Sequence, residues 1–300
     1  MNILAILPHY GAGAPRFLVD AFSRIDCRVF RVGPRYDLHL GMQWEDSEMP
    51  AIDLEIPKNS NWYVDDFVDA ATRQGAAPDM VLFSEESYDN LIVNTEKVPS
   101  IFYSCDGWES NYARAKMIKA TINYTNHPRG IRQEPQEELP DGWCWLPAGA
   151  LPTVHKYLGL ERKTDFVLLA TMYTERPRII QEIKDAGFTV KTGQVKTDEY
   201  VRAYNQSLAT IHNPGYFEIK WRWWEAAAMG CLNISPVIKP LSWLGYKPWF
   251  HYIPVSTEET SDGPWPDIKE SISVLSEIKS SRPFFQQIAD DARFYTLKNH

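Results

Sequence analysis

Short apolar runs alternate with stretches of helical periodicity along the first half of the chain. Apolar residues spaced as on one face of a helix occur at 16–25 and 62–73, for example Phe17, Leu18 and Phe22. The apolar runs have the length and composition of strands, and they lie at 2–7, 27–32, 78–83, 98–103, 120–124 and 143–146. This alternation predicts a parallel sheet covered by helices on both faces.

The same alternation restarts after residues 146–152, where Pro147, Gly149 and Pro152 interrupt both periodicities. Strands are predicted at 165–171, 188–192, 208–212 and 232–235, and helices at 178–186, 199–207 and 219–229. We therefore expect an α/β fold with two Rossmann-like domains, residues 1–150 and 151–300. Ligands would bind in the interdomain cleft, at the carboxyl ends of the strands.

The composition is that of a packed globular protein, with 44% hydrophobic and 23% charged residues among 300. No run approaches the ~20 apolar residues that a membrane span needs. Residues 1–7 have neither the basic start nor the cleavage site of a signal peptide. The four cysteines are far apart and show no metal-binding spacing. We expect a soluble, cytoplasmic protein with reduced thiols.

The formal net charge of −8 is unevenly distributed along the chain. The first 150 residues carry 13 basic and 22 acidic side chains, whereas the remainder carry 18 and 17. Proteins bind nucleic acids through Lys and Arg on the phosphates, so the acidic first half disfavours a nucleic-acid partner. A local basic strip on an acidic domain would still permit one.

The strongest chemical signal lies at 207–230, where a predicted strand ends near His212 and a loop follows. A helix is predicted from residue 219 to its cap at Gly230. Lys220 and Arg222 then fall in its first turn, where backbone N–H groups and the helix dipole already favour an anion. Two cations at this point predict a site for a diphosphate.

Two carboxylates flank these cations. Glu225, about one turn further along, can accept both hydroxyls of a ribose, and Glu218 in the loop can accept hydroxyls of a sugar. The pattern Arg-x-x-Glu-Ala-x-x-x-Gly at 222–230 resembles the donor site of GT-B glycosyltransferases, especially the group-1 and CgeB-like branches. The resemblance gives Glu225 the ribose, Arg222 and Lys220 the diphosphate, and Glu218 the sugar. The group-1 motif has seven residues between its two glutamates, whereas this chain has six.

A second segment resembles the same family. Residues 164–178 are similar to the opening strand, loop and basic residue of its C-terminal domain, which implies that Arg176 reaches the phosphates. We interpret Arg178 as a surface residue of the next helix. The resemblance covers about residues 146–255. It implies a donor-binding second domain, an acceptor-binding first domain, and a last helix near 283–295 that crosses back to the first domain.

The resemblance also implies that the donor is a nucleotide-sugar, UDP-linked before GDP-linked, with no further cofactor. No DxD-type motif follows a strand in the second half. We therefore predict that side chains and helix dipoles, and no metal, neutralise the leaving diphosphate.

Candidates for the acceptor side lie in the first half. Asp106 follows a predicted strand and is the first candidate for the base that an inverting transferase needs. An Asp at this position is equally typical of a helix N-cap. Glu85, Glu86 and His127 are further candidates, and a retaining enzyme would need no such base.

The turn after the first strand contains Gly11 and Gly13, which are candidates for close approach to a ligand in the cleft, and His9 is a candidate contact. This turn is a partial dinucleotide fingerprint, with Arg16 where the third glycine would stand.

The leading interpretation is a glycosyltransferase that moves a sugar from a nucleoside-diphosphate sugar to an acceptor hydroxyl. The acceptor is left open among a glycan, a small molecule, a protein and a modified DNA base. One alternative is an NAD(P)-dependent Rossmann oxidoreductase, although residues 31–35 offer no acidic partner for a cofactor ribose. Another is a non-catalytic two-lobed ligand-binding protein.

Overall fold

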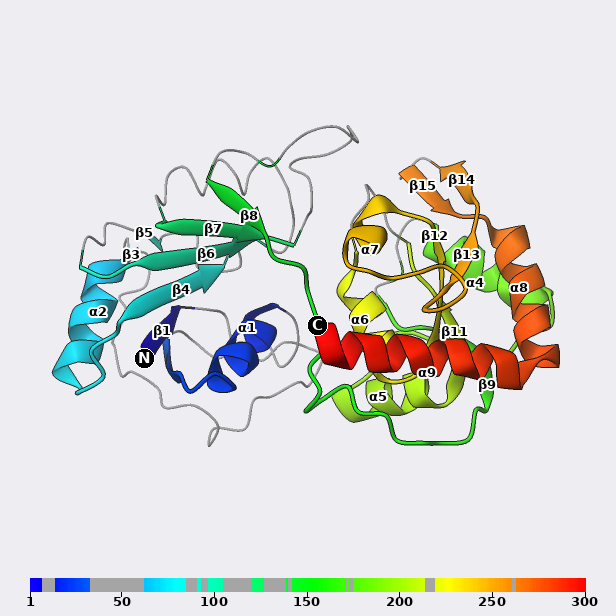
Figure 1. Cartoon of the computed structure of the whole chain (residues 1–300), viewed down its shortest axis with the longest axis horizontal. Helices are drawn as coiled ribbons and strands as arrows, with labels where there is room; N and C mark the ends of the chain where they lie inside the picture. Colours follow the sequence, from blue (N-terminus) through cyan, green and yellow to red (C-terminus); the bar gives the residue numbers. More distant parts are fainter. Residues whose placement is uncertain are drawn as a thin grey trace. The chain divides into compact units, whose positions relative to one another are not determined.

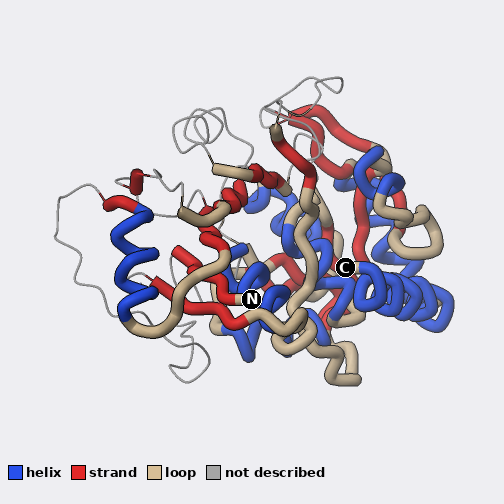
Figure 2. The backbone as a smooth tube through the Cα atoms, turned by 60° about the vertical axis from the view of Figure 1, so that its left-hand side comes forward, coloured by secondary structure: helices blue, strands red, loops and turns tan. Residues whose placement is uncertain are grey.

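The computed structural model describes residues 1–6, 14–32, 62–84, 91–92, 97–104, 120–126, 139, 142–170, 172, 175–213, 219–260 and 263–300. The chain divides into two compact units, Met1–Pro147 and Ala148–His300. The strands of each unit are red in Figure 2, and helices in blue accompany them.

The first unit contains a six-stranded, all-parallel sheet (Figure 1). Its order is β2-β1-β4-β6-β7-β8, from strands β1 (Asn2–Ile6), β2 (Arg28–Val32), β4 (Met80–Ser84), β6 (Ser100–Ser104), β7 (Ile122–Thr125) and β8 (Trp143–Trp145). Helices α1 (Ala14–Ser23) and α2 (Val64–Arg73) follow their predicted positions, and the short strands β3 (Trp62–Tyr63) and β5 (Leu91–Ile92) pair separately. Every strand predicted for this half is confirmed.

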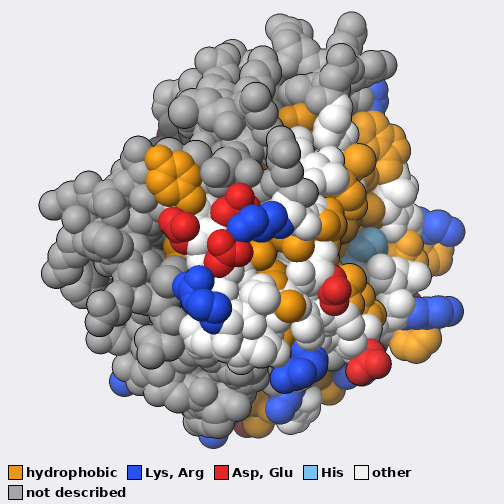
Figure 3. Space-filling view, turned by 90° about the vertical axis from the view of Figure 1, so that its left-hand side faces the viewer, with side chains coloured by type: hydrophobic (Ala, Val, Ile, Leu, Met, Phe, Trp, Pro, Cys, Tyr) orange, Lys and Arg blue, Asp and Glu red, His pale blue; other side chains and the backbone are white. Residues whose placement is uncertain are grey.

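The outer face of α2 is acidic. Asp65 and Asp66 lie in its first turn, and Asp69 pairs with Lys97 at 2.7 Å. Figure 3 shows acidic and basic side chains next to one another on this side of the molecule.

The second unit contains a five-stranded parallel sheet in the order β10-β9-β11-β12-β13. Its strands are β9 (Thr164–Leu168), β10 (Val190–Thr192), β11 (Ser207–Ile211), β12 (Leu232–Pro236) and β13 (Ile253–Val255). The chain moves from β9 outward to β10 and then returns to β11 on the other side of β9. This reversal is a topological switch point, where open α/β sheets bind ligands at the carboxyl ends of their strands.

Helices cover both faces of this sheet. They are α4 (Arg176–Asp185), α5 (Thr197–Asn205), α6 (Trp221–Ala228), α7 (Lys239–Trp243), α8 (Ile268–Ser280) and α9 (Arg282–Asn299). Strand β9 divides its buried residues between the two faces: Phe166 packs with α4, α8 and α9, whereas Val167 packs with α5 and α6. Strand β9 therefore presents apolar side chains on both faces of the sheet, as expected for a central parallel strand. Among the described residues no helix is long and apolar enough to cross a membrane.

Helix α6 is fixed by an aromatic cluster on the side of α9. Trp223 and Trp224 are fully buried and lie edge-on to the ring of Tyr246, with centroids 5.4 and 5.5 Å away. Tyr252 meets Trp223 in the same way at 5.2 Å. Because buried aromatic pairs of this geometry add to the free energy of packing, we expect α6 to be a rigid platform for its partly exposed residues, Arg222 and Glu225 among them.

All four strands and all three helices predicted between residues 165 and 235 are confirmed. Several boundaries differ by one to three residues, and the starts of two helices bear on the site. Helix α6 begins at Trp221, because Lys220 has extended backbone angles (φ −65°, ψ 149°) and serves as the N-cap. Helix α4 begins at Arg176, with Pro177 in its first turn, two residues earlier than predicted. A hairpin of β14 (Thr257–Thr260) and β15 (Gly263–Pro266) was not predicted.

Candidate functional site

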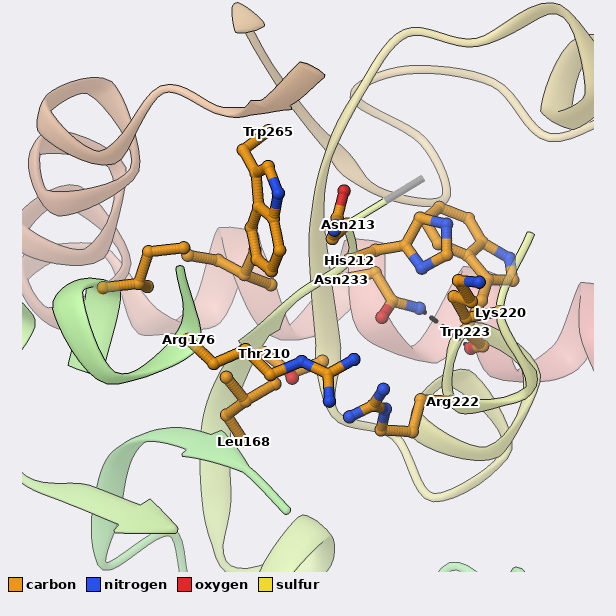
Figure 4. A pocket seen from close by; sticks show the side chains of 12 residues that line it. Leu168, Arg176, Thr210, His212, Asn213, Lys220, Arg222, Trp223, Asn233 and Trp265 are labelled. Carbon is orange, nitrogen blue, oxygen red and sulfur yellow. Dashed lines mark hydrogen bonds between the residues drawn. The ribbon is translucent and has the colours of Figure 1, made fainter. Parts of the chain in front are cut away.

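A recess lies at the switch point of the second unit (Figure 4). It has a volume of about 440 Å³, which includes the solvent at its mouth. Its lining comes from the carboxyl ends of β9 and β11, from the first half of β12, from the amino ends of α4 and α6, and from β15: Leu168, Arg176, Ile179, Thr210, Ile211, His212, Asn213, Lys220, Arg222, Trp223, Asn233 and Trp265. Three of the five residues predicted to bind the donor are in this set.

Two arginines approach each other in the recess. Arg176, the first residue of α4, is only 7% exposed, and its guanidinium extends toward that of Arg222 (Figure 4). Arg222 is the second residue of α6 and donates from Nη1 to the carbonyl oxygen of Leu169 at 3.4 Å. Guanidinium groups are fixed forks of donors that match phosphate oxygens, so this pair is suited to an anion with several oxygens.

Lys220 also lines the recess, but its place on α6 corrects the prediction. It is the N-cap and not a first-turn residue, since the helix begins one residue later. Its carbonyl oxygen accepts the N–H of Trp223 at 2.9 Å. The positive end of the helix dipole therefore faces the same recess as the two arginines.

The other side of the recess is polar and uncharged. His212, directly after β11, is 3% exposed, and burial, followed by the charges of Lys220 and Arg222, lowers its pKa to about 3. It is therefore neutral at physiological pH and adds no charge to the cationic side. Asn233 on β12 donates from Nδ2 to the carbonyl oxygen of Trp223 at 3.0 Å. Neither residue was predicted as part of the site, although the position of His212 directly after a strand could have indicated it.

Glu225 lies outside the recess, one turn along α6 from Arg222. Its side chain is 12% exposed. One carboxylate oxygen, Oε2, accepts a hydrogen bond from the hydroxyl of Tyr200 on α5, and the other, Oε1, lies 3.6 Å from Nε2 of His155. Burial, and next the charge of Glu225, raises the pKa of Tyr200 well above its usual value, so the phenol stays a donor. Neither Tyr200 nor His155 was predicted.

Arg178 is a surface residue of α4, as predicted. Its side chain is 39% exposed but is bound by three carboxylates: Glu175 at 2.5 Å, Glu182 at 2.7 Å and Glu258 on β14. The ion pair with Glu258, and then that with Glu175, raises the pKa of the guanidinium. Through the pair with Glu258, Arg178 therefore links α4 to the hairpin.

The remaining predicted residues lie outside the described part of the chain: Glu218 of the donor site, Asp106, His127, Glu85 and Glu86 as candidate bases, and His9, Gly11 and Gly13 of the first turn. Their roles stay predictions. Within the described residues, no group of three or more His, Cys, Asp or Glu side chains could hold a metal ion.

No protein-family model and no curated protein sequence matches the chain. Solved structures do match it over its whole length. Anabaena HepE in complex with UDP-glucose has a TM-score of 0.60 at 12% identity, covering 100% of this chain and 95% of that one. An alpha-glucosyltransferase in complex with UDP and a 13-mer DNA has a TM-score of 0.59 at 11% identity, covering 100% and 96%.

Sucrose-phosphate synthase from Thermosynechococcus elongatus is similar to the same degree, with a TM-score of 0.58 at 12% identity over 100% of this chain and 95% of that one. At these identities the likeness establishes the fold. The chain adopts the GT-B fold of these glycosyltransferases, as the donor-site pattern predicted.

Proposed function

We propose that the protein transfers a sugar from a nucleoside-diphosphate sugar to an acceptor hydroxyl, and that the second unit holds the donor. The observation that carries this proposal is the convergence of Arg176 and Arg222 in one recess at the switch point, with Glu225 one helical turn away. Cations followed by a carboxylate along one helix match the order of diphosphate and ribose in such a donor.

In this proposal Arg176, Lys220 and Arg222 bind the diphosphate and stabilise the negative charge that develops on it as the glycosidic bond breaks. Three cations and a helix N-terminus supply this stabilisation without a metal. Glu225 accepts the ribose hydroxyls, and Glu218 remains the predicted partner of the sugar. For an inverting reaction, Asp106 or His127 would take the proton of the acceptor hydroxyl.

UDP is the favoured nucleotide, because HepE and the alpha-glucosyltransferase were solved with UDP or UDP-glucose. The acceptor is open. The DNA in the alpha-glucosyltransferase complex keeps a DNA base among the candidates, whereas the acidic first half disfavours it. We propose a cytoplasmic location, with which the free thiols of the three described cysteines, Cys27, Cys144 and Cys231, are consistent.

The test is the thermal stabilisation of the protein by UDP, GDP, ADP, TDP and NAD. At a ligand concentration a hundredfold above Kd, a binder adds about 2.7 kcal/mol, which raises Tm by several degrees. One nucleoside diphosphate should stabilise the wild type, and Arg222→Ala and Glu225→Ala should lose most of this shift. Arg202→Ala, which removes an exposed arginine from the last turn of α5, is the matched control. Stabilisation by NAD alone would instead favour the oxidoreductase.

A further inference from the structure

Residues from other parts of the second unit lie against both oxygens of the Glu225 carboxylate. Tyr200 on α5 donates its hydroxyl to Oε2, and the imidazole of His155 faces Oε1 at 3.6 Å. His155 is 5% exposed, and the rings of His155 and Tyr200 are near each other, with centroids 6.3 Å apart. The carboxylate is thus hydrogen-bonded by one group and faced by a second, buried one, and its side chain is only 12% exposed.

A backbone contact sets the protonation of His155. Its Nδ1 accepts the N–H of Leu151 at 3.0 Å, so Nδ1 carries no proton. A neutral imidazole with an unprotonated Nδ1 must carry its proton on Nε2, the nitrogen that faces Glu225. The residue therefore presents an N–H to the carboxylate, and the short segment at the start of the second unit determines this orientation.

We propose that His155 and Tyr200 are positioning residues that orient Glu225 to bind the 2′- and 3′-hydroxyls of the donor ribose. The inference rests on the proposed function, because it needs a nucleotide in this site. Each carboxylate oxygen has two lone pairs. One contact from the protein on each oxygen leaves a second lone pair on each, spaced for two adjacent hydroxyls.

The physical advantage is preorganisation. A glutamate free to rotate loses side-chain entropy when it binds a diol, whereas one already fixed does not. Selection of a ribonucleotide over a 2′-deoxyribonucleotide should then depend on His155 and Tyr200, although neither touches the ligand. The preference for a ribonucleotide would thus depend on His155, near the start of the second unit, and on Tyr200 of α5. Neither residue belongs to α6, the helix that carries Glu225.

The experiment compares the Kd values for UDP and 2′-deoxy-UDP by calorimetry. We expect the wild type to prefer UDP by about tenfold or more, the usual effect of one hydrogen bond to a charged group. Tyr200→Phe removes only the hydroxyl, and His155→Asn keeps an acceptor near Nδ1 but loses the group at Nε2. Both should reduce the preference to about threefold or less. His155→Gln, whose amide reaches the Nε2 position, should restore most of it.

Controls separate this inference from the proposed function. Tyr204→Phe removes a hydroxyl from a ring that is tilted at 43° to that of Tyr200, with centroids 4.7 Å apart, but it leaves both contacts of Glu225 in place and should keep the preference. If Glu225→Gln loses the preference while Tyr200→Phe and His155→Asn keep it, the positioning role is wrong and the donor site stands. If the wild type binds no UDP, or Glu225→Gln discriminates like wild type, the proposed donor site is wrong and the inference fails with it.

Discussion

Arg178 of helix α4 forms an ion pair with Glu258 of strand β14. This pair links the helix that begins with Arg176 to the hairpin that contributes Trp265 to the recess. Two sides of the candidate site are thus joined by residues that do not line it.

We expect Arg178→Ala and Glu258→Ala to be coupled in their effects on the free energy of unfolding. Pairs with this degree of exposure contribute about 0.5–1 kcal/mol, and salt should weaken the coupling. A double-mutant cycle measured by urea denaturation at low and high ionic strength would give this energy. Additive effects at low salt would show that the pair does not stabilise the hairpin on α4.

His212 should make the stability of the second unit depend on pH. Its pKa falls from about 6.5 in the unfolded chain to about 3 in the folded one. Burial of neutral His212 therefore contributes its full share to the free energy of unfolding above pH 6.5, and this contribution is lost progressively as the pH falls toward 3. Between pH 7 and pH 5 this loss amounts to roughly 2 kcal/mol.

The measurement is the free energy of unfolding of wild type and His212→Asn across this range. The variant should lose less stability on acidification, although some slope should remain because burial also lowers the pKa of His251 and His300. Parallel pH profiles for wild type and variant would contradict the assignment.

Gly245 lies where the chain leaves α7, and it is required there for two reasons. Its φ is +80°, and a Cβ at this position would lie 2.0 Å from the hydroxyl oxygen of Tyr295 on α9. That hydroxyl donates to the carbonyl oxygen of Leu244 at 2.7 Å, so it cannot move without losing a bond. Gly245→Ala should cost about 3 kcal/mol, of which about 1 is backbone strain.

Gly187→Ala is the matched control, because Gly187 has a φ of +86° but no atom within 4 Å of a Cβ. It should cost only about 1 kcal/mol, the backbone strain alone. Equal melting temperatures for the two variants would show that the contact with Tyr295 is not rigid.

The strands and helices of the two sheets, and the cationic residues of the recess, could be predicted from the sequence because both depend on local patterns. Strand β11 and helix α6 are adjacent in sequence, so their apolar runs place Arg222 at a strand–helix junction. The start of α6 was misplaced because its N-cap is Lys220, which gives no Ser, Thr, Asp or Asn signal. Helix α8, which was not predicted, does have such a signal, since Asp267 caps it by accepting the N–H of Glu270.

The contacts around Glu225 were not predictable in this way. Tyr200 and His155 reach it from 25 and 70 positions earlier in the chain. In the sequence Tyr200 is one of two tyrosines of an amphipathic helix, which favours a core role. Trp265 stands between Pro264 and Pro266, and prolines argue against a strand except at a sheet edge. Long-range packing, and not periodicity, decides these positions.

The two arginines of the recess should act on the phosphates of the ligand and not on its nucleoside. We expect the wild type to bind UDP at least tenfold more tightly than UMP, because a charge-assisted contact to the second phosphate contributes about 1.5 kcal/mol or more. Arg176→Gln and Arg222→Gln should each reduce this ratio of affinities to about threefold, mainly by weakening the binding of UDP. Arg222→Lys keeps the charge but loses the fork of donors, so it should fall between wild type and Arg222→Gln. Titration calorimetry at two salt concentrations provides the test. A ratio that both substitutions leave unchanged would mean that the diphosphate lies elsewhere.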